Sequence, residues 1–118
     1  MNKRQQGKIS EEIALEFLLN KGFKPIDSNY TIKGGEVDLI MKDEDFIVFI
    51  EVKSLGSYSP FYIYESLTKK KKKFISHTIK KWLFENNMQD KPWRFDFIGI
   101  ILEFEQVKSI EHFKSVEL

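Results

Sequence analysis

The sequence predicts an α/β domain in which a mixed β-sheet is flanked by helices, with elements in the order αβββαββ. Three observations lead to this fold class. Apolar residues repeat with helical spacing after Ser10, the apolar run 46–50 has the character of a buried strand, and a second helical pattern separates that strand from two more strand-like segments. With 118 residues and no repeats or linkers, we expect a single domain over 1–118.

The composition excludes several classes of protein. Hydrophobic residues make up 42% and charged residues 31% of the chain, which suits an ordered core, and the absence of cysteine excludes disulfides and thiolate metal sites. The net charge is only +1, so binding to nucleic acid would require a local basic patch. Because no apolar run approaches the roughly 20 residues of a membrane span, we expect no membrane partner and a cytoplasmic location.

The first helix is predicted to begin with Ser10 as its N-cap and to end at Gly22. At 100° per residue Glu11 falls on the apolar stripe of this helix, whereas Glu12 lies off its centre. Two interpretations of Glu11 remain open. It is either a first-turn carboxylate that interacts with the helix dipole, or a metal or water ligand that faces the sheet.

A meander of three strands follows. A short strand around Tyr30 is joined by a Gly34-Gly35 turn to a strand over 36–41, and residues 43–45 form a second tight turn. The next segment, 46–50, is apolar on both faces and continues into Glu51 and Lys53, as expected of a central strand.

The second half of the chain returns from helix to strand. Residues 54–60 have the composition of a loop, and the segment from about Glu65 to Phe84 predicts a second helix. Strands are predicted over 94–102 and 107–113. The inward stripe of the second helix is expected to contain Ile75, Ile79, Trp82 and Leu83.

Glu51 and Lys53 end the buried central strand on one face, because side chains alternate across a strand. Val52 is expected to point to the opposite face, and Phe49 to continue the face of Glu51 inward. A carboxylate and an ammonium group are therefore placed side by side at the end of an apolar strand.

Asp38 lies on the preceding strand, with Val37 and Leu39 predicted on the other face. Two carboxylates from adjacent strands can converge there and bind a hard divalent cation such as Mg²⁺, while Lys53 orients a water or stabilises charge on a phosphate. The alternative is a solvated Glu51–Lys53 ion pair with Asp38 as an edge-strand charge. The apolar strand before Glu51 and the Gly-Gly turn before Asp38 together favour the metal site.

The basic run 69–73 consists of Lys69, Lys70, Lys71, Lys72 and Lys73. It is either a solvated helix face or a patch that contacts phosphates, and the second interpretation is favoured because five cations at a helix N-terminus oppose the macrodipole. Lys71 precedes Ile75 by one turn and is therefore predicted to point toward the sheet.

The remaining polar and aromatic candidates are less specific. Arg94 and Asp96 share a strand face and are most economically an ion pair that stabilises the fold or supports the site residues from behind. His77 and His112 lack a second ligand at metal spacing. A group of aromatic residues after the central strand could stack on bases or cover a sheet edge: Tyr58, Phe61, Tyr62 and Tyr64.

The segments 35–40 (GEVDLI), 49–53 (FIEVK) and 94–96 (RFD) resemble the YraN family of small predicted endonucleases, of the PD-(D/E)xK superfamily. The resemblance implies a fold similar to restriction endonucleases and Holliday-junction resolvases. It also implies catalytic roles for Glu11, Asp38, Glu51 and Lys53, with the carbonyl of Val52 expected as a further metal ligand. The family usually has glycine where this chain has Ser10 and a basic residue where it has Leu55.

From the residues and the resemblance together we expect a Mg²⁺-dependent endonuclease acting on DNA, with Mn²⁺ able to replace Mg²⁺. Branched or recombination intermediates are the substrates that the resemblance implies, and symmetric cutting of these would require a homodimer. The main alternative is a catalytically silent nucleic-acid-binding module with the same fold.

Overall fold

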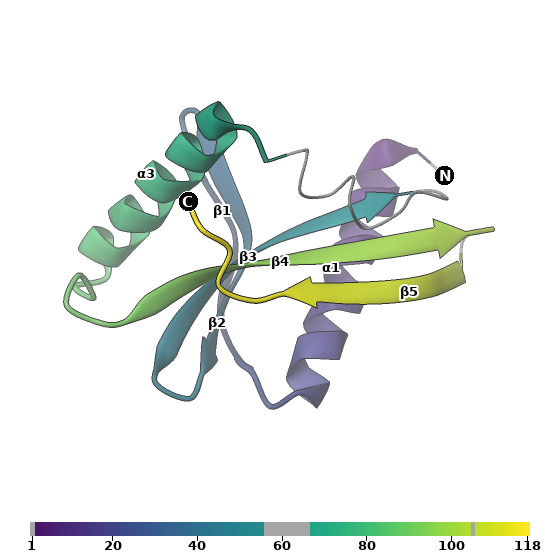
Figure 1. Cartoon of the computed structure of the whole chain (residues 1–118), viewed down its shortest axis with the longest axis horizontal. Helices are drawn as coiled ribbons and strands as arrows, with labels where there is room; N and C mark the ends of the chain where they lie inside the picture. Colours follow the sequence, from purple (N-terminus) through teal and green to yellow (C-terminus); the bar gives the residue numbers. More distant parts are fainter. Residues whose placement is uncertain (1, 56–66, 105) are drawn as a thin grey trace.

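Five strands form one sheet, and two helices pack against it, in the computed structural model described here for residues 2–55, 67–104 and 106–118 (Figure 1). The predicted mixed α/β fold and its order αβββαββ are confirmed within these residues. The elements are α1 (Lys3–Asn20), β1 (Lys24–Ile32), β2 (Gly35–Asp43), β3 (Phe46–Leu55), α3 (Lys69–Glu85), β4 (Trp93–Glu103) and β5 (Gln106–Phe113).

The strands follow their chain order across the sheet, β1-β2-β3-β4-β5. Strands β3 and β4 are parallel, with α3 in the connection between them, and the other neighbours are antiparallel. The predicted central strand is β3, in which Val48, Phe49 and Ile50 have no exposed surface. An apolar strand covered on both faces is the element that sequence identifies most directly.

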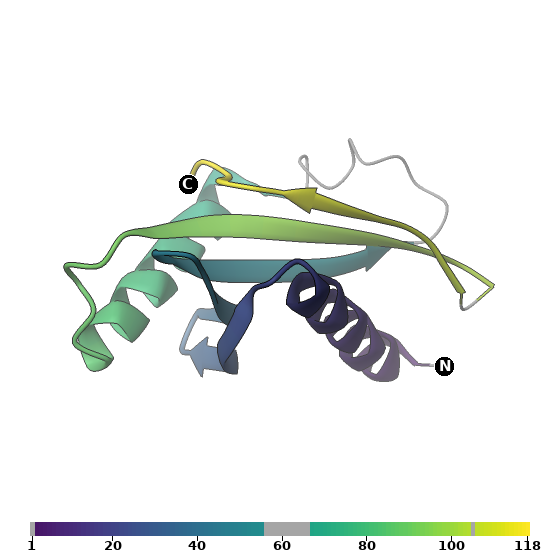
Figure 2. The ribbon, with the colours of Figure 1, turned by 90° about the horizontal axis from the view of Figure 1, so that it is seen from below.

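The sheet separates two hydrophobic clusters. Ala14 and Leu18 of α1 pack with Val48 and Ile50 of β3 on one face, where Figure 2 shows α1 running along the sheet. The other cluster contains Phe49 of β3 and the four residues predicted for the inward stripe of α3: Ile75, Ile79, Trp82 and Leu83. Alternate residues of β3 therefore bind the two helices to opposite faces.

The first hairpin turn differs from the prediction by one residue. Ile32 pairs with Gly35, so the two-residue loop is Lys33-Gly34, with Gly34 at a φ of +89°, and Gly35 belongs to β2. A Cβ added to Gly35 would overlap the Thr78 hydroxyl of α3. Gly35 therefore permits α3 to approach β2 closely.

The predicted start of the first helix was wrong. α1 begins at Lys3, with Asn2 as N-cap in a reciprocal capping box with Gln5. Ser10 lies inside the helix, where its buried hydroxyl donates to the Gln6 carbonyl oxygen at 2.8 Å. The first two turns carry no apolar stripe, which is why periodicity did not reveal them. The predicted end near Gly22, which has a φ of +95°, is confirmed.

Two other predicted boundaries differ from the structure. β3 continues through Ser54 and Leu55, which the loop prediction had included, and α3 begins only at Lys69 after the N-cap Thr68. The rest of that loop, the four aromatic residues and Glu65 lie outside the described residues. Within the described part of the chain, neither helix is long and apolar enough to cross a membrane.

Candidate active site

One cavity is lined by all four residues predicted to be catalytic: Glu11, Asp38, Glu51 and Lys53. The first comes from α1, the second from β2 and the last two from β3. The structure therefore brings together side chains that are up to 42 positions apart in the sequence (Lys53 against Glu11).

Asp38 takes the place of a backbone group in the sheet. The β2–β3 register runs from the pair Asp43 and Phe46 to the pair Leu39 and Ile50. At the next position the Asp38 side chain intervenes, and its Oδ2 accepts a hydrogen bond from the Val52 N–H at 2.8 Å. The carboxylate is thus fixed between the two strands at the edge of the cavity.

Strand β2 is irregular at Asp38, which corrects one sequence prediction. Val37 packs in the cluster beneath α3 and Leu39 in the cluster beneath α1, so they do not share a face. On β1 the opposing residue, Asn29, has a φ of +51°, and neither it nor Asp38 belongs to the paired register. The irregular backbone at Asp38 interrupts the alternation of side chains, so residues two positions apart no longer point to the same face of the sheet.

Glu51 and Lys53 follow the predicted alternation. Phe49 packs beneath α3 and Val52 against the α1 cluster, which places Glu51 on the α3 face with Phe49. Oε2 of Glu51 is buried and has no hydrogen-bond partner, and it is the only such side-chain oxygen or nitrogen among the described residues. An unsatisfied buried carboxylate oxygen is costly, and it is the kind of atom that a metal ion can satisfy.

Glu11 faces the cavity as predicted, whereas Glu12 is exposed. The carboxyl groups of Glu11 and Asp38 are neighbours in the cavity and interact electrostatically. Because α1 begins at Lys3, Glu11 lies in the third turn and not the first, so the helix-dipole interpretation of this residue was wrong.

Electrostatics in the cavity favour protonation of its carboxyl groups. Burial raises the pKa of Asp38, the Val52 N–H opposes this, and the neighbouring charges of Glu11 and Glu51 add to it, giving a value of about 7. Burial likewise raises the pKa of Glu11 and of Glu51. The nearby ammonium groups of Lys53 and Lys71 partly counter the effect at Glu51.

Comparison with known proteins shows the family of this chain. The model of the uncharacterised protein family UPF0102 matches residues 10–100. The chain belongs to the UPF0102 family. A UPF0102 protein of Clostridioides difficile is 38% identical over 110 residues, covering 93% of this chain and 96% of its own. One from Carboxydothermus hydrogenoformans is 40% identical over 85% of both chains, and one from a Sulfurihydrogenibium species is 38% identical over 99% and 100%. All four predicted catalytic residues lie in the matched region.

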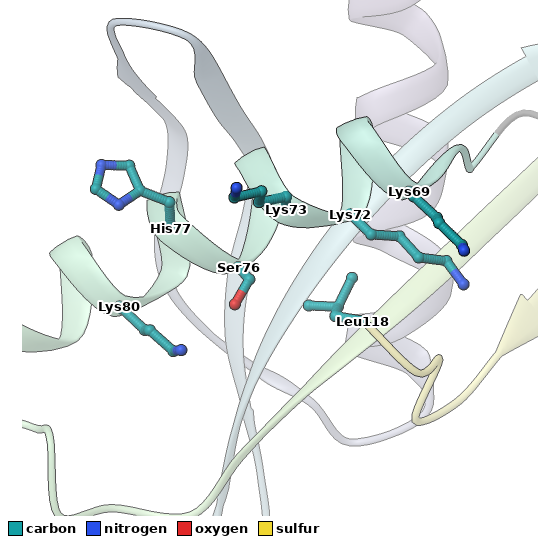
Figure 3. Close-up of a pocket in the computed structure, with 7 residues that line it drawn as sticks. All are labelled: Lys69, Lys72, Lys73, Ser76, His77, Lys80 and Leu118. Atoms are coloured by element: carbon teal, nitrogen blue, oxygen red, sulfur yellow. The ribbon is translucent and has the colours of Figure 1, made fainter.

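Four of the five lysines in the basic run of this UPF0102 chain are near one of two cavities. Lys71 is exposed, so the prediction that it points away from solvent was wrong, but its charge acts on Glu51 across the α3 face. Lys69, Lys72 and Lys73 instead line a separate hollow along α3 with Ser76, His77, Lys80 and Leu118. Figure 3 shows Lys69 and Lys72 extending on the side of Leu118 and Lys73 extending the other way.

Arg94 and Asp96 form the predicted ion pair, and neither lines the cavity. Arg94 Nε lies 3.0 Å from Asp96 Oδ1, and a second guanidinium nitrogen lies 2.9 Å from Asp43 Oδ2. His112, for which the sequence offered no metal partner, lies with its Nε2 2.7 Å from Asp96 Oδ2. His77 is exposed on α3.

Sequence reasoning missed part of the cavity lining. The additional residues that line it are Arg4, Gln5, Gly7, Lys8, Asn29 and Glu36. Arg4 and Lys8 precede Glu11 at helical spacings of seven and three residues, so extending the helix back to Lys3 would have placed them on the face of Glu11. The misplaced helix start concealed that signal.

Proposed function

We propose that the protein is a metal-dependent endonuclease that hydrolyses phosphodiester bonds in DNA, as its likeness to the YraN family and the PD-(D/E)xK superfamily implies. The observation that carries the proposal is the partnerless buried oxygen of Glu51, which lies in one cavity with Asp38 and Lys53. Carboxyl groups desolvated in a cavity, with pKa values raised by burial, are typical of functional sites.

Asp38 and Glu51 suit Mg²⁺, with Mn²⁺ as a chemically similar substitute. Within the described residues no three His, Asp or Glu side chains form a ready-made metal cluster. Mg²⁺ commonly takes only one or two carboxylates and completes its shell with water and substrate oxygens, so two acids and the Val52 carbonyl are a suitable set. When bound, the metal supplies Lewis acidity and lowers the pKa of a coordinated water.

The chain's own residues have separate roles in the proposed reaction. Lys53 presents a positive charge beside Glu51, where it orients the attacking water or stabilises charge that develops on the phosphate. Glu11 lines the same cavity, and its carboxyl group interacts with that of Asp38 and helps to hold it in place. The Val52 N–H fixes the other side of Asp38. Glu11 is therefore a positioning residue in this proposal.

The substrate class follows from charge and from the family resemblance. Lys71 extends the positive charge around Glu51, and the α3 hollow with Lys69, Lys72 and Lys73 is suited to phosphates farther along the strand. We propose DNA, including branched or recombination intermediates, as the substrate, with a homodimer for symmetric cutting and a cytoplasmic site of action.

The proposal is tested by incubating the purified protein with Mg²⁺ or Mn²⁺ and end-labelled duplex, single-stranded and four-way-junction DNA, with RNA in parallel. We expect metal-dependent cleavage that Asp38→Ala, Glu51→Ala and Lys53→Ala each reduce by at least about 100-fold. Glu12→Ala is the matched control for Glu11→Ala, because Glu12 is its exposed neighbour on α1.

Each other outcome has a defined meaning. Absence of cleavage on every substrate, or cleavage unchanged by Asp38→Ala and Glu51→Ala, refutes the nuclease. Salt-sensitive binding without cleavage, weakened by neutralising Lys69 to Lys73, identifies the silent nucleic-acid-binding module instead. Cleavage of RNA but not DNA would support phosphodiester hydrolysis and would show that the substrate is RNA.

A further inference from the structure

Gly7 occupies a position where the fold itself has no need of glycine. It lies inside α1, where glycine is about 0.5–1 kcal/mol less favourable than alanine. A Cβ added to Gly7 would have no atom within 4 Å, in contrast to Gly35, where an added Cβ would overlap Thr78. Close packing therefore explains Gly35 but not Gly7.

Gly7 lies on the wall of the acidic cavity. Arg4, Gly7, Lys8 and Glu11 line it together, and their spacing of three, one and three residues puts them on one face of α1. Arg4, Gly7 and Lys8 are exposed. Two cations thus flank a stretch of helix backbone that carries no side chain, and Glu11 lies directly beyond it.

A polyanion that enters this cavity meets the charges of Asp38, Glu51 and Glu36, so it needs cations beside them. Lys53 supplies one on β3, and Arg4 and Lys8 supply two on α1. Lys8 and Glu11 are three residues apart, which is about 4–5 Å along a helix. A cation one helical turn from the carboxylates is therefore suited to a phosphate next to the one that reacts.

We propose that Arg4, Gly7 and Lys8 form a docking site for a non-scissile phosphate of the substrate strand, and that Gly7 is bare so that the strand can lie against α1. The inference rests on the proposed function, because it takes the cavity as the place where the strand is cut. It assigns substrate positioning to a segment outside the region matched by the family model, residues 10–100.

The test compares Gly7→Ala, Gly7→Gln and the double variant Arg4→Gln/Lys8→Gln by fluorescence anisotropy with a labelled single strand and a labelled duplex. Ca²⁺ replaces Mg²⁺ so that binding is measured without turnover. Glu12→Gln controls for substitution on α1, and Lys24→Gln controls for loss of an exposed cation on β1. Cleavage in Mg²⁺ and thermal unfolding are measured on the same samples.

We expect Gly7→Gln and the double variant each to weaken binding by about tenfold or more. In the double variant the slope of log K against log salt concentration should also fall by the equivalent of about one to two phosphate contacts. Gly7→Ala should have a smaller effect, and the controls should bind within about twofold of the wild type. Neither Gly7 variant should lower the melting temperature, because alanine and glutamine are better helix formers than glycine.

Wild-type binding by Gly7→Gln overturns the docking site, and if the wild type still cleaves, the proposed function stands without it. If Gly7→Gln loses binding and the wild type does not cleave, the proposed nuclease activity is refuted and the phosphate-docking site on α1 is supported. A lowered melting temperature with binding lost in proportion means that Gly7 serves the fold, which also overturns the inference. If the wild type neither binds nor cleaves, both proposals fail.

Discussion

Two groups of carboxylates in this protein are removed from water in different ways. Asp96 has no exposed surface, and both of its carboxylate oxygens accept hydrogen bonds. Oδ1 accepts from Arg94 and from the Ser115 N–H, and Oδ2 accepts from Arg94 and from His112. Burial acts to raise the pKa of Asp96, but the hydrogen bonds from His112, Arg94 and Ser115 outweigh it and lower the pKa.

The cavity carboxylates show the reverse balance. Burial raises the pKa of Asp38 to about 7, against a single hydrogen bond from the Val52 N–H, and Glu51 keeps an oxygen without a partner. Burial alone therefore does not separate the two groups, whereas the number of hydrogen-bond donors around each carboxylate does. We infer that the paired Asp96 stabilises the fold, whereas the cavity carboxylates are left with oxygens that a ligand would satisfy, at a cost in stability.

The largest expected effect is on the paired group. Asp96→Asn removes the charge that Arg94 and His112 surround, and we expect it to lower the free energy of unfolding by about 3–5 kcal/mol. Urea denaturation followed by circular dichroism measures this loss. Asp43→Asn is the matched control, because Asp43 binds the same Arg94 but its side chain is 25% exposed, so its effect should be much smaller. Equal losses for the two variants would contradict the contrast.

The opposite sign is expected in the cavity. Asp38→Asn removes a desolvated charge but retains an oxygen that can accept from the Val52 N–H. We expect it to raise the free energy of unfolding at pH 8 without metal. The gain should be only about 1–2 kcal/mol, because the side chain is partly exposed and water screens its charge. Measured by the same denaturation, a variant that is less stable than the wild type would show that Asp38 serves the fold.

The pH dependence of stability should distinguish the groups further. The pKa of Asp38 is about 7 in the folded state, above its unfolded value of roughly 3.9. Its contribution to the free energy of unfolding is therefore fully present below about pH 4 and is lost as the pH rises through about 7. The stability gain of Asp38→Asn should therefore grow between about pH 4 and pH 7. Asp96 has a lowered folded pKa, so its contribution is present above the unfolded pKa and lost on acidification.

Paired denaturation series from pH 4 to pH 8 measure this difference. The wild type and Asp38→Asn should diverge with rising pH, whereas the wild type and Asp96→Asn should converge as the pH falls toward the acid end. Parallel curves for Asp38→Asn would mean that its carboxyl group titrates alike in the folded and unfolded states, and would remove the basis for the contrast.

The smallest expected effect concerns the lysine run. Lys71→Gln removes a charge that lowers the pKa of Glu51, so the acid limb of a pH–rate profile should move to higher pH, with a few-fold loss of cleavage on that limb. Lys70→Gln, an exposed neighbour outside the α3 hollow, is the control and should leave the limb in place. A shift of the same size for both would indicate a general charge effect.

The sequence allowed the fold and the centre of the site to be predicted because both depend on short-range patterns. The apolar run before Glu51 and the stripe that includes Glu11 are periodic signals, and the glycines before Asp38 are a turn signal. These signals identified the elements that carry the three residues, and the cavity contains all three.

The remaining features depend on contacts that periodicity does not describe. The capping box of Asn2 and Gln5 begins α1 before any apolar stripe, which concealed Arg4 and Lys8. The pairing of Asp96 with His112 joins residues 16 positions apart on neighbouring strands. The distortion of β2 at Asp38 depends on the opposite strand, so no rule of alternation within one strand predicts it.

The most direct test of the central claim is calorimetric titration of Mn²⁺ into the wild type, Asp38→Asn and Glu51→Gln at pH 8. We predict one class of site in the wild type, lost in both variants although both remain folded. Wild-type binding should also release protons near pH 7, because Asp38 must be ionised to serve as a ligand. Equal Mn²⁺ binding by all three proteins, or none by the wild type, would contradict the account.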